Sequence, residues 1–425
     1  MELNKEHFLV KGGKPLQGSL RIHGAKNAAL PVMAACLLSP GTCRIENIPL
    51  LSDVLTMARI FEAVGCSSEF KDGVLTANCA NLCSGVVPKF LMREIRSSII
   101  VVGALLARQG YALVSRPGGC EIGRRNIDLH IKGLKALGAE LEDKGGNLLF
   151  TAKRLIGSTI YLDYPSVGAT ENIMLAAVTA QGITYIDNAA REPEIIDLQV
   201  FLNRLGGRVT GAGTNQIRID GVSKLGDAQH SIIPDRIVAG TMMVAAALTG
   251  GDVTLLDVVP GHLTVAAAKL REMGAQVEFN GDWVRVGSFA LLEAVDKIRT
   301  APHPGFPTDL QAQFMAALAT AKGVSRIEEM VFESRYKHVD ELLKMGANIS
   351  AGKEIATIIG VSKLYGATVT ATDLRAGAAL VIAGLAAQGT TTVTQIHHID
   401  RGYVALEDQL TALGADIRRV KGEPG

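Results

Sequence analysis

The stretch Leu270-Arg-Glu-Met-Gly-Ala-Gln-Val-Glu-Phe279 carries the pattern that decides the fold. It reads as the end of an amphipathic helix, then a glycine that stops the helix, then an alternating segment typical of a strand. Five other stretches repeat this pattern. The six stop glycines lie 68 to 73 residues apart, at positions 65, 138, 206, 274, 346 and 414. This spacing predicts six copies of one structural unit.

A second glycine marks each copy, at the end of an apolar helix and before another strand. These glycines are at positions 41, 110, 182, 251, 323 and 389. The helices before them, such as 173–178, 314–319 and 378–385, have little or no polar face. A helix that is apolar all round must be buried on all sides. We therefore expect an α/β fold with helices inside and sheets outside, and two domains of three units each.

Size and composition limit the possible functions. The chain has 425 residues, of which 48% are apolar and 20% charged, as in globular proteins. A net charge of +1 provides no basic field for nucleic acid or a membrane surface. The N-terminal residues do not form an apolar signal segment, and no apolar run is long enough to span a membrane. We expect a cytoplasmic protein with neither nucleic-acid nor membrane partners.

The cysteines and histidines do not predict a metal site. The six cysteines are irregularly spaced, so structural disulfides are not expected. Cys79 and Cys83 lie close together, but no second pair completes a zinc site. His397 and His398 would point to opposite faces of a strand. We predict that the protein holds no metal and no cofactor.

The loop Arg116-Pro-Gly-Gly-Cys-Glu-Ile-Gly-Arg-Arg125 is the first candidate for chemistry. Glycines let a backbone approach a ligand closely, and nearby arginines favour a thiolate and attract anions. Cys120 on this loop therefore points to a phosphorylated or carboxylated substrate. The alternative is a flexible surface loop that happens to carry a thiol.

The starts of the apolar helices form the second candidate. We expect them near 26–27, 93–96, 168–170, 235–236, 308–309 and 373–375. Helix N-termini bind anions through free N–H groups and the helix dipole. Three of them turned toward one cleft would attract anions strongly. The alternative, that Asn27, Thr308 and Asp373 are only helix caps, leaves the charged residues at five of the six starts unexplained.

Four stretches together carry a family resemblance. They are Gly24-Ala-Lys-Asn-Ala-Ala-Leu-Pro31, the Cys120 loop, Pro302-His-Pro-Gly-Phe-Pro-Thr-Asp309 and His398-Ile-Asp-Arg-Gly-Tyr403. In this order the chain resembles the UDP-N-acetylglucosamine 1-carboxyvinyltransferase family, within the EPSP synthase superfamily. The resemblance implies an inside-out α/β barrel in each of two domains. One would span residues 24–232 and the other would combine 1–23 with 233–425, with the active site in the cleft between them.

The implied reaction transfers the enolpyruvyl group of phosphoenolpyruvate to the 3′-hydroxyl of UDP-N-acetylglucosamine and releases phosphate. In this family it is the first committed step of peptidoglycan synthesis, and it proceeds by addition and elimination through a tetrahedral ketal. The thiol of Cys120 would protonate the methylene carbon and could hold a pyruvate adduct. A cysteine at this position also implies sensitivity to fosfomycin, an epoxide that alkylates that thiol.

Other roles are carried over by motif. Asp309 would act as base toward the sugar hydroxyl or orient it, and Lys26 and Arg401 would contact the transferred phosphate group with help from Arg125. The remaining substrate-binding residues implied are Asn27, Arg96, Asn126, Ile127, Asp128, Leu129, Ser166, Val167, Gly168, Val331, Arg335, Asp373 and Arg375. Among them, Asp373 would hold the arginines by pairing with them.

Three other functions compete with this one. The shikimate-pathway enolpyruvyl transferase shares fold and reaction type but lacks the Pro-Gly-Gly-Cys pattern. A cysteine phosphatase requires Cys-x₅-Arg, whereas the sixth residue after Cys120 is Asn126. A non-catalytic paralogue that only binds the nucleotide sugar is disfavoured by the intact Cys120, Lys26 and Asp309.

Overall fold

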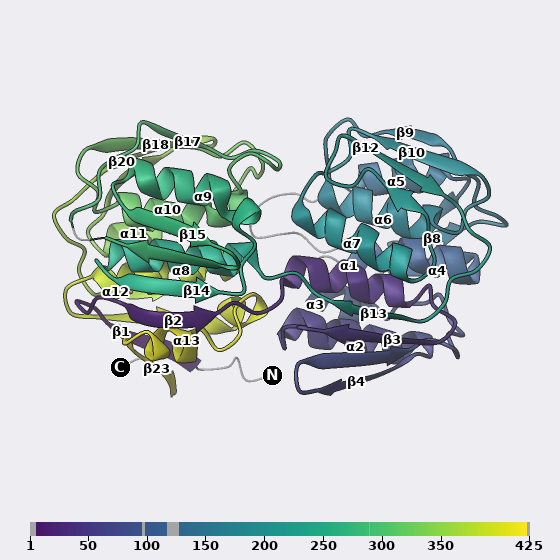
Figure 1. Ribbon diagram of the computed structural model, residues 1–425, viewed down its shortest axis with the longest axis horizontal. Helices are drawn as coiled ribbons and strands as arrows, with labels where there is room; N and C mark the ends of the chain where they lie inside the picture. The colour runs from purple at the N-terminus through teal and green to yellow at the C-terminus, as the bar shows by residue number, and fades with distance from the viewer. Residues whose placement is uncertain (1–5, 96–97, 117–126, 289, 423–425) are drawn as a thin grey trace. The chain divides into compact units, whose positions relative to one another are not determined.

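The computed structural model describes residues 6–95, 98–116, 127–288 and 290–422. These residues form two compact units. The continuous unit consists of described residues between Gly24 and Ile233. The split unit combines the segment that ends at His23 with the segment that begins at Pro234. The chain therefore passes from one unit to the other after His23 and again after Ile233 (Figure 1).

The elements of the continuous unit are α1 (Lys26–Cys36), β3 (Thr42–Glu46), α2 (Ser52–Val64), β4 (Ser67–Lys71), β5 (Val74–Asn78), α3 (Lys89–Glu94), η1 (Ser98–Ile100), α4 (Val101–Gln109), β6 (Tyr111–Ser115), α5 (Asp128–Ala136), β7 (Glu140–Lys144), β8 (Asn147–Thr151), β9 (Thr159–Tyr161), α6 (Val167–Ala177), β10 (Ile183–Asp187), α7 (Pro193–Arg204), β11 (Val209–Thr210), β12 (Gln216–Asp220) and β13 (Ala228–Ser231).

Those of the split unit are β1 (Glu6–Lys11), β2 (Gln17–Arg21), α8 (Arg236–Leu248), β14 (Asp252–Leu256), α9 (Pro260–Glu272), β15 (Gln276–Asn280), β16 (Trp283–Gly287), β17 (Lys297–Arg299), η2 (Thr308–Leu310), α10 (Gln311–Leu318), β18 (Val324–Glu328), α11 (Val339–Lys344), β19 (Asn348–Ala351), β20 (Ile355–Ile359), β21 (Thr368–Thr370), α12 (Leu374–Ala386), β22 (Thr390–Thr394), η3 (Ile396–Arg401), α13 (Leu406–Ala412) and β23 (Asp416–Lys421).

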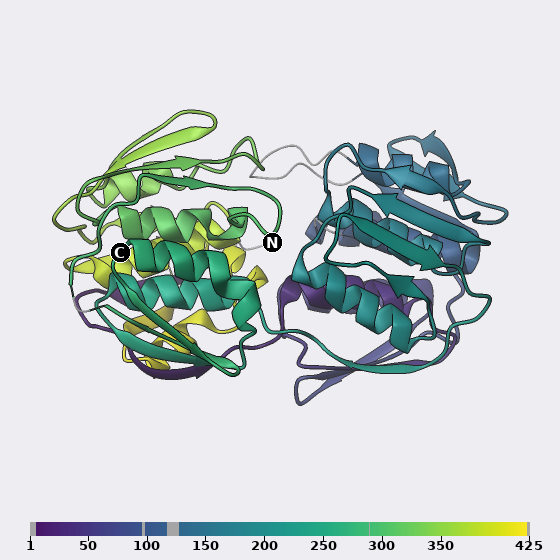
Figure 2. The ribbon, with the colours of Figure 1, turned by 45° about the horizontal axis from the view of Figure 1, so that its top comes forward.

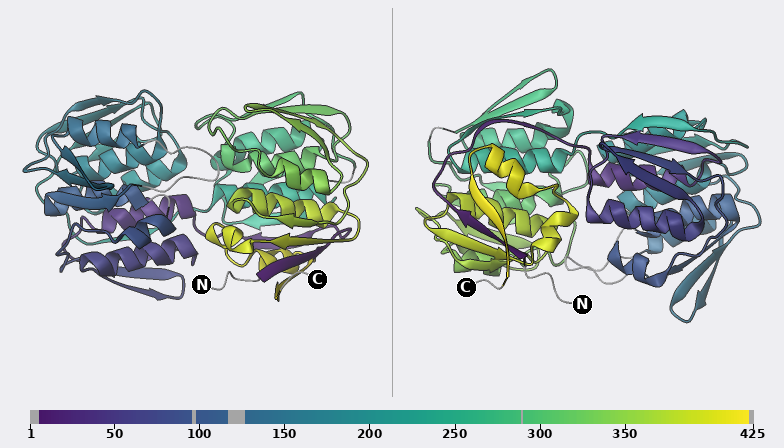
Figure 3. Two further views of the ribbon diagram at one scale, coloured as in Figure 1. Left: turned by 180° about the vertical axis from the view of Figure 1, so that it is seen from behind. Right: turned by 90° about the horizontal axis from the view of Figure 1, so that it is seen from below.

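Each unit places apolar helices inside and three sheets outside, so the predicted inside-out α/β architecture is confirmed. In the split unit the inner helices α8, α10 and α12 contact one another (Figure 2). In the continuous unit the inner helices are α1, α4 and α6 (Figure 3). The amphipathic helices pack against them, as α2 and α7 do on α1 and α9 does on α8. The apolar helices thus lie inside each unit and the amphipathic helices pack around them, as predicted.

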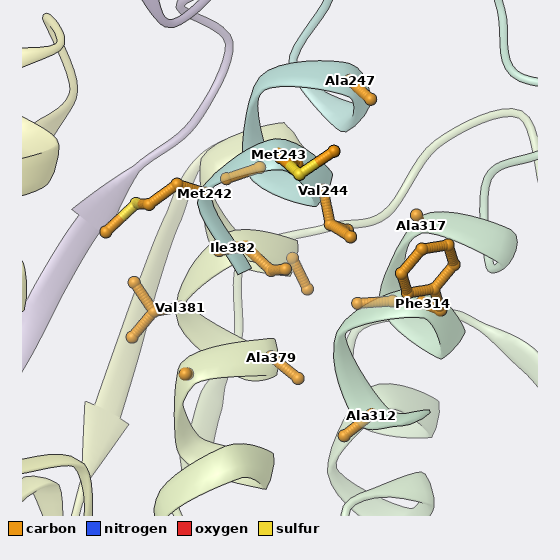
Figure 4. Packing of buried hydrophobic residues seen from close by; sticks show 14 of the residues in the cluster. Met242, Met243, Val244, Ala247, Ala312, Phe314, Ala317, Ala379, Val381 and Ile382 are labelled. Atoms are coloured by element: carbon orange, nitrogen blue, oxygen red, sulfur yellow. The ribbon is translucent and has the colours of Figure 1, made fainter. Parts of the chain in front are cut away.

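The core of the split unit shows why the inner helices lack a polar face. Met242 and Val244 of α8, Phe314 of α10 and Ile382 of α12 are fully buried (Figure 4). The ring of Phe314 meets Phe306 edge-on, with 5.0 Å between the ring centroids. Small residues such as Ala317 and Ala379 fill the space between these larger side chains. Since all sides of each helix are covered, a polar side chain there would lose its contact with water.

The sheets share one plan. In four of the six sheets, the strand that follows an inner helix pairs antiparallel with a hairpin strand on one side and parallel with a short strand on the other, as β10 does with β12 and β9. Among the described residues, the sheet of β6 lacks the parallel strand, and the antiparallel partner of β22 is the N-terminal β1. The sheet orders are β13-β3-β5-β4, β6-β8-β7 and β11-β12-β10-β9 in the continuous unit, and β15-β16-β14-β2, β17-β18-β20-β19 and β21-β22-β1-β23 in the split unit. The recurring plan is the structural form of the sequence repeat.

Two of the parallel strands are exchanged between the units. β2 precedes α1 of the continuous unit but pairs with β14 of the split unit. β13 precedes α8 of the split unit but pairs with β3 of the continuous unit. In Figure 1 the dark purple β2 accordingly lies among the later-coloured strands of the split unit. Before each crossing, the chain therefore forms a strand that belongs to a sheet of the unit from which it departs.

The six stop glycines all have positive φ, between 86° at Gly346 and 101° at Gly206. Adding a Cβ in this left-handed region costs roughly 1–2 kcal/mol. We expect Gly274→Ala, where φ is 91°, to lower the free energy of unfolding by about that amount. Urea denaturation followed by circular dichroism measures the change.

Gly261→Ala is the matched control for this substitution, because Gly261 lies in the first turn of α9, the helix that Gly274 follows. A Cβ there meets no other atom within 4 Å, and the backbone is not left-handed. The control should be neutral or slightly stabilising. Equal losses from both substitutions would contradict the explanation from backbone conformation.

One local expectation was wrong. The second inner helix begins at Val101, not near 93–96, because the extended Ile95 ends α3 first. Gly41 and Gly251 do not have positive φ; they are close-packed against Asp227 and Leu16. Within the described ranges, none of the helices has the length and apolarity that crossing a membrane requires.

Candidate active site

Asp309 lies where the inner helix α10 begins in the split unit, on the short turn η2. Its Oδ1 accepts a hydrogen bond from Nη2 of Arg335 at 2.9 Å, and its Oδ2 accepts one from Nε of Arg375 at 3.2 Å. The arginine side chains are only 3% and 2% exposed, whereas that of Asp309 is 26% exposed. The carboxylate thus holds two buried cations and still reaches solvent.

The three inner helices of this unit all begin with an aspartate nearby. Asp235 caps α8 by accepting from the N–H groups of Ile237 and Val238. Asp373 caps α12 in the same way, through the N–H groups of Arg375 and Ala376. Asp309 instead directs both carboxylate oxygens to arginine side chains. Asp373 is therefore a helix cap, and Arg335 and Arg375 contact Asp309 instead of Asp373.

Arg375 is held in a fully buried position. Its guanidinium carbon lies 5.3 Å from the ring centroid of Tyr403, a cation–π arrangement. Burial alone would lower the pKa of Arg375, but Tyr403, Asp309 and Asp235 together raise it above its ordinary value. The side chain therefore stays charged, and its planar donors suit bidentate recognition of carboxylate or phosphate.

A buried polar network fixes these groups. The hydroxyl of Tyr403 lies 2.9 Å from Oγ1 of Thr241 on α8 and 3.2 Å from Nε2 of Gln313 on α10. The same Nε2 lies 2.9 Å from the backbone carbonyl of Asp309, which it can also donate to. The residues on α8, on α10 and after η3 are thereby linked. The quoted motif ended at Tyr403, but sequence reasoning gave this residue no role.

Glu329 is a second residue that sequence reasoning missed. Its buried carboxylate accepts from the hydroxyls of Thr300 and Thr308 and from the N–H of Val331, at 2.9–3.0 Å. It thereby connects the turn that carries Asp309 to the predicted sugar-site residue Val331. A signal was present: Ser325 and Ile327 are buried, and strand alternation places residue 329 on the same inward face.

His338 is buried beside this cluster and provides a pH test. Burial, with the charge of Arg335 added, lowers its pKa to about 4 despite the opposing effect of Asp373. In the unfolded chain its pKa is about 6.5. The neutral imidazole therefore contributes stability that is complete above about pH 6.5 and is lost as the pH falls toward about 4.

We expect His338→Gln to flatten the fall in unfolding free energy between pH 6.5 and 4, by roughly 1–3 kcal/mol over that range. Urea titrations of both proteins at several pH values measure this difference, and comparing slopes removes the contributions of other groups. His397→Gln is the control: partial desolvation also lowers the pKa of His397, but this residue is exposed, so its substitution should flatten the curve much less. Parallel curves for His338→Gln and the parent would contradict the prediction.

In the continuous unit, Lys26 is the first residue of α1. Its Nζ lies 3.4 Å from Oδ2 of Asp53, in the first turn of α2, and the two side chains are 10% and 5% exposed. A buried ammonium requires such a partner to remain charged. Asn27, the next residue, is half-buried. Asp53 was not singled out from the sequence, because an acid in a first helical turn is ordinary.

The predicted nucleotide contacts lie at two helix starts that the structure brings together. Ile127, Asp128 and Leu129 are at the start of α5, and Ser166, Val167 and Gly168 are at the start of α6. A Cβ on Gly168 would lie 3.2 Å from the ring of His130, so the two helix ends approach closely. Ser166 caps α6 by accepting from the N–H of Ala169.

His130 is joined to the inner helices by a hydrogen-bond chain. Oδ1 of Asn172 accepts from the N–H of Gly103 on α4, so its Nδ2 donates to Nδ1 of His130 at 3.0 Å. The proton of a neutral His130 is therefore on Nε2.

Of the remaining predicted residues, the structure describes Arg401 and leaves four outside the described ranges. Arg401 is the half-buried last residue of η3, two positions before Tyr403. Cys120, Arg96, Arg125 and Asn126 lie outside the described residues. In the described part of the chain, no cluster of three or more histidine, cysteine or acidic side chains could hold a metal ion. The described residues thus place basic side chains at the inner helices of each unit, Lys26 in one and Arg335 and Arg375 in the other.

Comparison with known proteins gives the class. Residues 10–410 match the family model described as EPSP synthase (3-phosphoshikimate 1-carboxyvinyltransferase), and the chain belongs to this family. The enolpyruvyl transferase NikO from Streptomyces tendae has a similar structure, with a TM-score of 0.90, 26% identity, and 99% of this chain and 100% of that chain covered. EPSP synthase from Acinetobacter baumannii, at 19% identity over 98% of this chain and 100% of that one, shares the fold with a TM-score of 0.74.

More similar relatives point to one enzyme. UDP-N-acetylglucosamine 1-carboxyvinyltransferase 2 of Carboxydothermus hydrogenoformans is 52% identical over 98% of this chain and 99% of its own length. The protein of the same name from Caldanaerobacter subterraneus subsp. tengcongensis is 50% identical over 97% and 99%. The resemblance expected from the four motifs is confirmed.

Proposed function

We propose that this protein transfers the enolpyruvyl group of phosphoenolpyruvate to the 3′-hydroxyl of UDP-N-acetylglucosamine and releases phosphate, in peptidoglycan synthesis. The observation that carries the proposal is an identity of about one half, over nearly the whole chain, with relatives named for this reaction. The match to a model named for the shikimate enzyme gives the wider family and leaves the acceptor open. The full-length relatives therefore decide between the two acceptors.

The addition step requires two proton transfers. The sugar hydroxyl oxygen bonds to the central carbon of phosphoenolpyruvate and gives up its proton, while the methylene carbon gains one, which produces a phosphate-bearing ketal. Asp309 receives or orients the hydroxyl proton in this proposal. A carboxylate has about four acceptor sites, and two hydrogen bonds from arginines leave room for a hydroxyl. Cys120 supplies the proton to carbon.

The elimination step reverses one transfer. The methyl group loses a proton, the bond between carbon and the phosphate oxygen breaks, and phosphate leaves. Negative charge on phosphate and carboxylate must be neutralised throughout. We assign this role to Lys26, Arg335, Arg375 and Arg401, together with Arg96 and Arg125. The helix starts at 127–129 and 166–168 would bind the nucleotide part, with Asn27 and Val331 nearer the sugar.

A phosphate-release assay tests the proposal. The full chain is incubated with phosphoenolpyruvate and UDP-N-acetylglucosamine, and in parallel with phosphoenolpyruvate and shikimate 3-phosphate. We expect release only with the nucleotide sugar. Release only with shikimate 3-phosphate would assign the other acceptor. Tight binding of the nucleotide sugar without any phosphate release would instead support a non-catalytic sensor.

The proposal includes a cytoplasmic location and inactivation by fosfomycin. Cell fractionation with an antibody to the chain tests the first. Mass measurement of the fosfomycin-treated protein tests the second, and the proposal requires the adduct on the peptide that contains Cys120.

A further inference from the structure

Five of the six cysteines lie between residues 36 and 83, in the first repeat of the continuous unit, and the proposed reaction uses none of them. Cys36, Cys43, Cys66 and Cys79 are buried and Cys83 is exposed, and all five are reduced. Interaction between neighbouring thiols shifts the pKa values of two pairs, Cys36 with Cys43 and Cys66 with Cys79.

Sheet register places Cys66 directly opposite Cys79. In the antiparallel pair of β4 and β5, Ser67 lies opposite Asn78. One step further along this register brings Cys66 opposite Cys79, and residues that face each other across two strands point to the same face. The N–H of Cys79 donates to the carbonyl of Gly41, on the side of β3. Cys66 and Cys79 are therefore a non-hydrogen-bonded pair, in which the Cα atoms lie about 4.5 Å apart.

This separation suits a disulfide, whose Cα atoms lie about 4.4–6.8 Å apart. The two thiols are also chemically unequal. The hydrogen bond from Cys79 lowers the pKa of Cys66, against the effect of burial, and Arg108 adds to the lowering. The same hydrogen bond, with burial, raises the pKa of Cys79.

A surface cavity gives access to this pair. It has a volume of about 350 Å³ and is lined by polar residues on both sides of Cys66, namely Glu62, Gly65, Ser67, Ser68, Asn78 and Asn81. Cys66 itself lines the cavity and is 5% exposed, whereas Cys79 is fully covered behind it. Cys36 and Cys43 do not line this cavity, although they form a similar thiol pair.

We propose that Cys66 and Cys79 form a dithiol site that exchanges with a small-molecule disulfide entering this cavity and closes to an intramolecular disulfide. The thiolate of Cys66 attacks one sulfur of the incoming disulfide, which forms a mixed disulfide and releases the first small thiol. Cys79 gives up its proton and attacks the sulfur of Cys66, which releases the second. Two protein thiols are oxidised, and one small disulfide is reduced to two thiols that take up the protons. Structural disulfides remain unexpected, because this bond is reversible.

Peptide mapping tests the site in the unaltered full chain. The protein is incubated with oxidised glutathione, free thiols are alkylated under denaturing conditions, and the protein is digested with trypsin. Cys66 then lies in peptide 60–71 and Cys79 in peptide 72–89, which also holds Cys83; Cys36 and Cys43 share peptide 27–44. We expect peptides 60–71 and 72–89 to become disulfide-linked, and peptide 27–44 to be fully alkylated.

Two variants identify the partner within peptide 72–89. Cys83→Ser should retain the link, because Cys83 is not opposite Cys66 in the sheet. Cys79→Ala should lose it and accumulate a glutathione adduct on Cys66. The proposal is overturned if peptides 60–71 and 72–89 stay unlinked in the unaltered chain, or if the link disappears with Cys83→Ser. The result does not depend on activity, so it stands apart from the enolpyruvyl-transfer proposal.

Discussion

Replacing Asp309 with asparagine is expected to lower turnover about 10²–10⁴-fold, the usual contribution of a general acid–base group. Asparagine keeps the shape of the side chain but cannot take up the hydroxyl proton. It also offers only one oxygen to Arg335 and Arg375, which both donate to the carboxylate. Because the loss concerns the chemical step, the change should be in kcat much more than in KM. Steady-state phosphate release measures both.

The control for this substitution is Asp252→Asn. Asp252 also receives two hydrogen bonds from one arginine, Arg285, but on the surface of β14 and β16. Its turnover should be that of the parent. A second readout separates proton transfer from positioning: if Asp309 accepts the proton, the acidic limb of the kcat–pH profile should disappear in the asparagine variant. Turnover of Asp309→Asn within about threefold of the parent would contradict the role.

Removing the guanidinium of Arg375 is the second large effect expected. Arg375→Ala should lower the free energy of unfolding by about 3–5 kcal/mol, the cost of breaking a buried ion pair. The side chain is 2% exposed, lies over the ring of Tyr403 and pairs with Asp309, so the substitution removes both packing and charge at one point. Urea denaturation measures the loss. Turnover should also fall, because Asp309 keeps Arg335 but loses Arg375.

Arg285→Ala is the matched control for stability. Arg285 also pairs with an aspartate, Asp252, but half of its side chain is exposed. Exposed ion pairs of this kind contribute about 0–1 kcal/mol. If Arg285→Ala costs as much as Arg375→Ala, burial is not the reason for the effect.

The repeat and the helix types were predictable because they depend on local chemistry. A glycine must occupy a left-handed helix end, and an all-apolar helix must be buried, whatever surrounds it. The start of α4 was misplaced because the turn after α3 depends on the conformation of Ile95, for which the sequence gives no breaker residue. Strand alternation could have identified Glu329, but its four partners come from three separate segments.

The candidate site was predictable in its residue types and less so in its pairing. Asp309, Arg335 and Arg375 were expected in one pocket and do meet. The family resemblance implied Asp373 as the partner of the arginines. In the structure the carboxylate of Asp373 instead accepts hydrogen bonds from N–H groups at the start of α12. Which of several aspartates serves as a cap depends on the direction of each side chain, and that is set by tertiary packing.

The position of β1 between β22 and β23 has a consequence for biosynthesis on the ribosome. All strands of the continuous unit come from one uninterrupted segment, so they have all been made once β13 is synthesised. The split unit needs β1 between β22 and β23, so one of the first segments made waits for the last. Until then the nascent chain carries an unpaired strand with both edges open, which is a risk for wrong pairing. Trimming the first strand should therefore harm only the unit that is completed last.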